Sequence, residues 1–314
     1  MGRRSRARSP LAASLAAGIA GALVSPAVLA HALAESRAAG QTLGWSFEPW
    51  VILPLLVSAL GYAIGITSLW RRAGAGHGVS LRGASAFAAG WAALVVALLT
   101  PLDPLGSRLF SAHMVQHELL MLAAAPLLVL GRPLAVWAWA LPQPWRRASG
   151  RFFHHPAWRL PWLLLTSPLV AWLLHALVLW LWHVPALFDA ALDDPLVHTW
   201  QHLSFLLTAL VFWWSVLGAV TRKEQGVALV SLFTTMVHTG ALGALLTLAR
   251  APWYAHYVAI APLFGLTALE DQQLGGVIMW VPAGAVYIVS GLALARRWIE
   301  PRPASRTAPG LEPR

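Results

Sequence analysis

Seven apolar segments of similar length follow one another along this chain of 314 residues, and polar stretches separate them. Each is close to the roughly 20 residues that an α-helix needs to cross a bilayer. Their approximate bounds are 47–70, 84–101, 109–130, 162–183, 198–220, 227–250 and 275–295. The pattern predicts an all-α fold, a polytopic membrane helical bundle of seven transmembrane helices that occupies residues 45–298.

The two ends of the chain differ from this bundle. Residues 1–32 combine a basic front, an apolar core of small residues and an A-x-A pattern at 30–32. These features predict a signal peptide, with an uncleaved first span as the alternative. The Pro- and Arg-rich residues 299–314 predict a disordered cytoplasmic tail. The apolar stretch 134–141 is too short to cross, and we expect it at the membrane interface, where Trp residues gather.

Composition supports a membrane protein and narrows its chemistry. Hydrophobic residues make up 58% of the chain and charged residues 11%, whereas soluble domains carry about 25% charged residues. The mean hydropathy is +0.64. The absence of cysteine excludes disulfides, thiolate metal sites and thiol catalysis. Any metal site must therefore use His, Met, Asp or Glu.

The net charge of +10 has a topological explanation. If the mature N-terminus lies outside, nearly all basic residues after the signal segment fall in inside loops or the tail, and only Arg37, Arg108 and Arg250 fall outside. This asymmetry predicts an N-terminus outside and a C-terminus in the cytoplasm, in a bacterial plasma (inner) membrane. The basic excess thus indicates membrane topology and contact with membrane lipid, and we expect no nucleic-acid partner.

Histidines supply the main candidate chemistry, at the outer ends of three predicted spans. His113 and His117 are four residues apart, so on a helix they share one face. His198 and His202 repeat that spacing, and His183 closes the fourth span at the same depth. A lone pair is more often a polar cap, but two pairs and a fifth histidine at one depth favour a metal site. Imidazole suits copper, and it also suits haem held by two histidines.

Five other residues are candidates to support such a site. Asp194, four residues before His198, could orient that imidazole by hydrogen bonding. Met114 is a soft side chain beside the first pair. Asp271 and Gln272 could bond to the cluster, or could simply begin a helix. His238 falls in mid-span and is either a packed hydrogen-bonding group or a deeper relay or transient metal site.

Three segments together resemble the CtaG-type cytochrome c oxidase assembly factors of bacteria, the cysteine-free polytopic group. They are AHMVQHELLMLAAAPLLVLGRP at 112–133, LWHVPALFDAALDDPLVHTWQHLSFLLTALVFWW at 181–214 and EDQQLGGVIMWVP at 270–282. The resemblance implies a plasma-membrane protein of respiratory-chain biogenesis, with the catalytic subunit of a haem–copper oxidase as partner and copper delivery or site assembly as its role. The matching positions are His113, His117, His183, His198, His202, Asp271 and Gln272.

Two other functions stay open from the residues alone. A haem-binding membrane cytochrome would use the histidine pairs as axial ligands. A copper transporter would need ligands that continue across the bilayer, for which His238 is the deep candidate. We expect no enzymatic activity, because the chain has no Ser–His–Asp pattern, phosphate loop or paired catalytic carboxylates.

Overall fold

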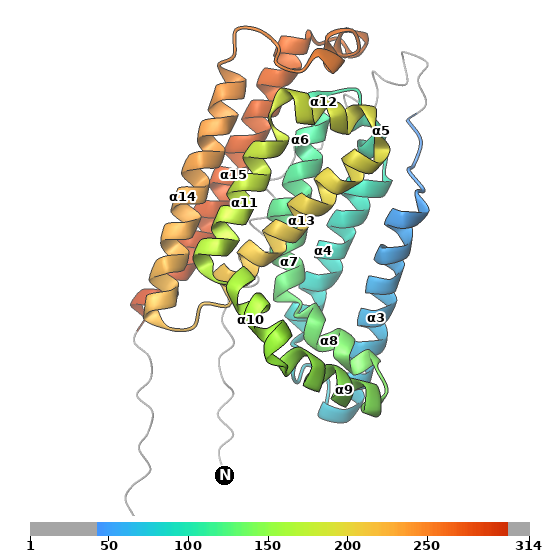
Figure 1. Ribbon diagram of the computed structural model, residues 1–314, viewed down its shortest axis with the longest axis vertical. Helices are drawn as coiled ribbons and strands as arrows, with labels where there is room; N and C mark the ends of the chain where they lie inside the picture. The colour runs from blue at the N-terminus through green and yellow to red at the C-terminus, as the bar shows by residue number, and fades with distance from the viewer. Residues whose placement is uncertain (1–42, 301–314) are drawn as a thin grey trace, which may run out of the picture.

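The third apolar segment forms the centre of the bundle. The structure, a computed structural model, describes residues 43–300, so the predicted signal segment 1–32 and nearly all of the predicted tail lie outside the described residues. The third span, Phe110–Leu130, has 83% of its apolar window buried, against 17% to 39% in the other unbroken spans. The other helices therefore surround it and turn their outer faces to lipid (Figure 1).

The described residues are helical, without strands, which confirms the predicted all-α membrane bundle. Six helices are long and apolar enough to cross a membrane, or seven when a bent pair counts as one span. The helices that carry the spans are α3 (Pro49–Ala73), α4 (Leu81–Leu99), α6 (Phe110–Glu118) with α7 (Ala125–Leu130), α10 (Pro156–Leu165) with α11 (Pro168–Trp182), α13 (Pro195–Leu217), α14 (Arg222–Thr247) and α15 (Ala268–Ile299). The short helices are α5 (Leu102–Gly106), α8 (Pro133–Ala140), α9 (Gln143–His154), α12 (Pro185–Asp193), η2 (Ala255–Val258) and η3 (Ala261–Phe264).

The fourth span is broken where the sequence pattern predicts one continuous helix. α10 and α11 meet at an angle of 65°. Ser167 takes an extended conformation and Pro168 begins α11, and a proline disfavours helical geometry in the residue before it. The predicted loop between the third and fourth spans is also largely helical, and its first helix, α8, packs against α3, where Trp137 donates to the Ser58 carbonyl at 3.1 Å.

The seventh helix begins seven residues earlier than its apolar pattern predicts. The Thr267 hydroxyl accepts from the Glu270 amide, and the Glu270 carboxylate accepts from the Thr267 amide at 2.8 Å. This capping box lets the polar residues before the apolar run join the helix. Lower down, Gly276 of α15 lies against the Gly243 carbonyl of α14, so small residues allow the two helices to approach closely.

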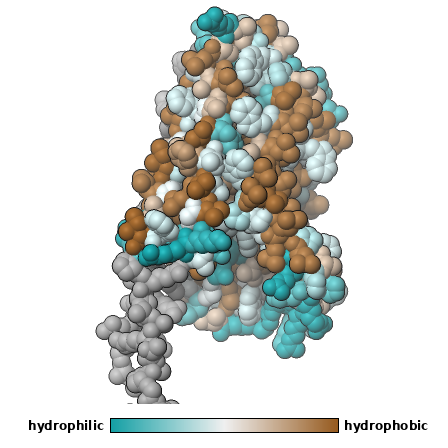
Figure 2. Space-filling model, turned by 60° about the vertical axis from the view of Figure 1, so that its left-hand side comes forward, coloured by the Kyte–Doolittle hydropathy of each residue, from teal (hydrophilic) through white to brown (hydrophobic). Residues whose placement is uncertain are grey.

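The two ends of the bundle differ in chemistry. The spans alternate in direction. At the lower end in Figure 1, four helices end (α3, α7, α13 and α15) and two helices begin (α4 and α14). We call this the arginine end, after Arg71, Arg72, Arg82, Arg132, Arg222, Arg296 and Arg297. The opposite end, with α5, α12 and the starts of α6 and α13, is the histidine end. Figure 2 shows hydrophobic side chains covering the flank between hydrophilic ends.

A π-helix, Leu119–Ala124, joins α6 to α7 directly below the first histidine pair. The Ala125 amide bonds to the Leu120 carbonyl, five residues back. The next residue, Pro126, has no amide hydrogen, so the Met121 carbonyl loses its donor within the helix. The buried indole of Trp213 donates to that carbonyl at 2.9 Å instead. A hydrogen bond from α13 therefore supports the irregular turn of the central span.

We predict that Trp213→Phe lowers the free energy of unfolding by about 1–3 kcal/mol, because the buried Met121 carbonyl would lose its hydrogen-bond donor. Circular dichroism of the purified protein during thermal unfolding in detergent measures the change. Trp200→Phe is the matched control, since Trp200 is 64% exposed on the same helix. Equal unfolding midpoints for the two variants would contradict the role given to Trp213.

Candidate metal centre

Three elements bring five imidazoles together at the histidine end. α6 carries His113 and His117 one turn apart, α13 carries His198 and His202 in the same way, and His183 follows the last residue of α11. The first pair has ring centroids 4.4 Å apart, and the second pair 4.2 Å. All five histidines predicted from spacing and depth therefore lie in one cluster, which we call the histidine cluster.

Contacts between the helices close this cluster. The His113 ring lies 5.3 Å from that of His198 and 5.5 Å from that of His202. The His117 ring lies 5.4 Å from that of His202 and 6.0 Å from that of His183. The pairs on α6 and α13 thus face each other, and His183 approaches from the side of His117.

One set of three ligand atoms is nearly close enough to share an ion. His113, His117 and His202 each offer a nitrogen, and these atoms lie within 4.8 Å of one another. Two nitrogens bound to one ion at about 2.0–2.1 Å can be at most about 4.2 Å apart. Movements of less than an ångström would bring the three imidazoles to binding distance.

Burial and missing hydrogen bonds also favour an ion here. His113, His117, His183 and His202 are between 0% and 7% exposed. Several imidazole nitrogens are buried without a hydrogen-bond partner: both ring nitrogens of His117 and the Nε2 atoms of His183, His198 and His202. Most buried polar atoms in proteins have a partner. Unpartnered imidazole nitrogens gathered in one cluster are suited to a metal ion, and imidazole is among the ligands that copper accepts, so the residues present fit copper.

Aromatic side chains form the wall around the histidine cluster. Phe205 lies 4.4 Å from the His117 ring and Phe188 lies 4.9 Å from the His113 ring, and both are fully buried. Towards the aqueous side, the Tyr254 ring packs 4.3 Å from that of Phe188, and its hydroxyl donates to the His183 carbonyl. The segment after α14 therefore packs over the aromatic wall and the backbone of His183.

Three further polar residues belong to the site: Asp103, Gln116 and Gln201. Histidine spacing alone does not identify them as ligands or as partners of ligands. Asp103, on α5, forms a second possible ligand set with His198 and His202. The Gln116 amide donates to that carboxylate at 3.0 Å, and the Gln201 amide oxygen lies 3.2 Å from His113 Nε2. Each glutamine immediately precedes a histidine of the cluster, which is a signal the sequence does contain.

Asp271 acts on the helix that carries the first pair rather than on an imidazole. Its carboxylate accepts from the amides of Phe110 and Ser111 at 2.6 and 3.0 Å. These are the first amides of α6, which have no partner within the helix. Asp271 is fully buried, and a negative charge at a helix N-terminus is also favourable. It therefore fixes the position of His113 and His117 from 160 residues away.

The other candidates lie around the cluster without bonding to it. The Asp194 carboxylate caps α13, accepting from the Leu196 and Val197 amides. Gln272 accepts from the Trp253 amide at 2.6 Å. Met114 packs in the apolar core near Gly275 of α15. His238 accepts from the Trp180 indole at 3.3 Å, in mid-bundle.

Comparison with known proteins gives the family of the chain. The fold and the site together define a multi-span membrane protein with a histidine cluster at one end of its helical bundle. A model of the cytochrome c oxidase caa3 assembly factor family (Caa3_CtaG) matches residues 60–301, and the chain belongs to that family. This confirms the resemblance seen in the sequence.

Three curated relatives are uncharacterized mycobacterial proteins. Those of Mycobacterium bovis and Mycobacterium tuberculosis are 28% identical over 265 residues, and that of Mycobacterium leprae is 26% identical. The match covers 81% of this chain but 39% of each relative, so the chain spans about two-fifths of their length. No solved structure matches the chain.

We predict that Asp271→Ala lowers the free energy of unfolding by about 1–2 kcal/mol, because the first turn of α6 loses its cap. Asp271→Asn should keep most of the stability, since an amide oxygen still accepts from an amide hydrogen. Thermal unfolding of both variants in detergent tests this ordering. An alanine variant as stable as the wild type would show that the cap contributes little.

Proposed function

We propose that this protein is a non-enzymatic assembly factor that carries copper as cargo for a haem–copper oxidase. The observation that carries the proposal is the histidine cluster, with five imidazoles from three elements and several buried nitrogens without partners. A carrier of this kind needs to hold an ion and release it, which neutral imidazoles allow. The name of the family supports the role in oxidase assembly.

The packing of the cluster favours a single ion over haem. A haem held by two histidines requires the flat macrocycle to pass between their rings. Here the rings of facing histidines are 5.3–5.5 Å apart, and Phe188 and Phe205 occupy the adjoining space. Haem binding would need both pairs to separate and the aromatic wall to open, whereas ion binding needs small movements.

The distribution of ligands favours release at the same end over transport across the bilayer. Within residues 43–300, sets of three or more possible ligands occur only at the histidine cluster. The deeper histidines have other partners, since His175 bonds to Thr208 and His238 bonds to Trp180. We therefore infer lateral transfer to the oxidase catalytic subunit within the membrane, and we rank the copper transporter below it.

The two ligand sets suggest how copper reaches the buried site. Asp103 and His198 are partly exposed, whereas His113 and His117 are buried, and His202 belongs to both sets. A carboxylate attracts a hydrated cation, and the shared imidazole could pass the ion to the inner nitrogens without free diffusion. We infer that Asp103, His198 and His202 form the outer station and that His113, His117 and His202 form the inner station.

Charge distribution supports the placement of the site in the cell. The basic side chains gather at the arginine end, and Lys and Arg favour the cytoplasmic side of a membrane. We therefore place the histidine end on the outer side of a bacterial plasma membrane. From there the protein would take copper from the extracytoplasmic space.

We predict that His117→Ala and His202→Ala each abolish copper retention and oxidase maturation while the protein remains inserted in the membrane. Each variant removes a ligand of the inner station. Metal analysis with absorption spectroscopy of the purified protein measures copper and also detects haem. His155→Ala is the matched control, because His155 is exposed and remote from the cluster. Full oxidase activity in both cluster variants would refute the assignment.

We predict that Asp103→Asn slows copper loading about tenfold or more but leaves the final copper content unchanged, because the inner nitrogens remain. Stopped-flow loading of copper-free protein, followed by metal analysis, separates rate from content. Asp193→Asn is the control, since that side chain is 77% exposed at the same end. Loading at the wild-type rate would contradict the outer station.

A further inference from the structure

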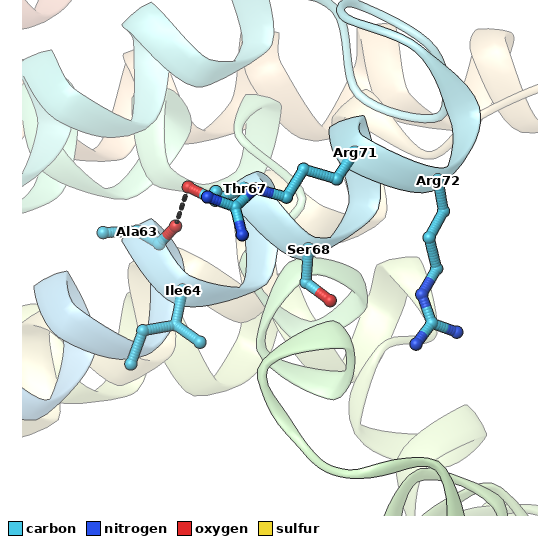
Figure 3. Close-up of a pocket in the computed structure, with 6 residues that line it drawn as sticks. All are labelled: Ala63, Ile64, Thr67, Ser68, Arg71 and Arg72. Atoms are coloured by element: carbon cyan, nitrogen blue, oxygen red, sulfur yellow. Dashed lines mark hydrogen bonds between the residues drawn. The ribbon is translucent and has the colours of Figure 1, made fainter.

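We infer that the arginine end holds a binding site for an anionic phospholipid on the surface of α3. Figure 3 shows its polar part, an open groove of about 620 Å³ lined by Ala63, Ile64, Thr67, Ser68, Arg71 and Arg72. Arg71 extends back along the helix towards Thr67, Arg72 points to the other side, and Ser68 lies between them. This site is remote from the histidine cluster and does not depend on the proposed copper function.

Arg71 and Arg72 of the groove, together with the neighbouring Arg146, form an unbalanced positive charge. Arg72 and Arg146 both lie over the ring of Trp139, at 5.8 and 4.0 Å from its centroid. Two guanidinium groups thus converge on one indole, and Arg71 is adjacent. In the part of the chain that the structure describes, no carboxylate makes an ion pair with these three arginines. Like charges that converge without a carboxylate favour an external anion.

The surface next to the groove indicates that this anion belongs to a lipid. Leu53, Val57, Leu60 and Ile64 recur every three or four residues on α3, so they share one face, and each is between 57% and 64% exposed. The same spacing continues to Thr67 and then Arg71. One helix face therefore presents an apolar track, then the Thr67 hydroxyl, then the Arg71 guanidinium group, with Ser68 and Arg72 on the adjoining side of the groove.

This order matches the parts of a phospholipid. The acyl chains would lie along the track, the glycerol region at Thr67 and Ser68, and the phosphate at Arg71 and Arg72. Arg146, which shares the Trp139 ring with Arg72, adds positive charge beside the groove. Arg is suited to phosphate because its planar fork donates two parallel hydrogen bonds. Basic sites between helices at a membrane surface are typical binding places for anionic headgroups. A free phosphate would use the guanidinium groups but not the apolar track.

The test uses the full chain, stripped of lipid in detergent, and native mass spectrometry with added phosphatidylglycerol or phosphatidylcholine. We expect retention of phosphatidylglycerol over phosphatidylcholine. The double variant Arg71→Gln and Arg72→Gln should lose about 10- to 30-fold in phosphatidylglycerol affinity, since each basic residue contributes on the order of 1 kcal/mol. The double variant Arg222→Gln and Lys223→Gln removes the same charge at the same end and should keep the wild-type affinity.

Two further measurements separate lipid from free anion. Ile64→Asp places a carboxylate in the apolar track and should weaken phosphatidylglycerol binding, while millimolar inorganic phosphate should not displace the lipid from the wild type. Equal losses in the two arginine-end double variants, or displacement by inorganic phosphate, would overturn the proposal. Copper retention should be unchanged in the Arg71 and Arg72 variant, so failure here is distinguishable from failure of the proposed function.

Discussion

The structure depends on how a fully surrounded membrane helix satisfies its polar groups. The third span carries Ser111, His113, Gln116, His117 and Glu118 in two turns, and all five are buried. Within the bilayer there is no water to form hydrogen bonds with these polar groups, so other helices must supply the hydrogen-bond partners. The Asp271 carboxylate of α15 accepts hydrogen bonds from the first two amides of the span. Gln201 of α13 contacts His113, and the Gln116 side-chain amide donates to the Asp103 carboxylate of α5. The side-chain atoms of this span that remain without partners are three imidazole nitrogens of His113 and His117 and one oxygen each of Gln116 and Glu118.

This distribution separates residues that hold the framework from residues free to bind. Asp271 and Trp213 use their polar atoms on the backbone of the central span, one at its start and one at the π-helix. The imidazoles of His117, His183 and His202 keep unpartnered nitrogens within the same few turns. A helix fixed at both places by its neighbours can present two imidazoles with little freedom, so an ion would meet ligands already close to their binding positions. Such preorganisation lowers the cost of binding.

The bundle joins two chemically different ends through one continuous set of spans. Imidazoles and a partly exposed carboxylate gather at one end, and guanidinium groups gather at the other. A cation is suited to the first and a lipid phosphate to the second. The outer faces between them are apolar, as the proposed lateral transfer to a membrane partner requires.

The sequence by itself determined the approximate positions of the spans and the end of the bundle at which the five histidines lie, because hydropathy acts locally along the chain. It also indicated which histidines share a helix face. Only the tertiary structure decided that the pairs of α6 and α13 face each other, that Asp103 joins them, and that Asp271 and Asp194 cap helices rather than touch imidazoles. These outcomes depend on helix rotation and tilt. Packing between residues as far as 160 positions apart sets rotation and tilt, and no local pattern records it.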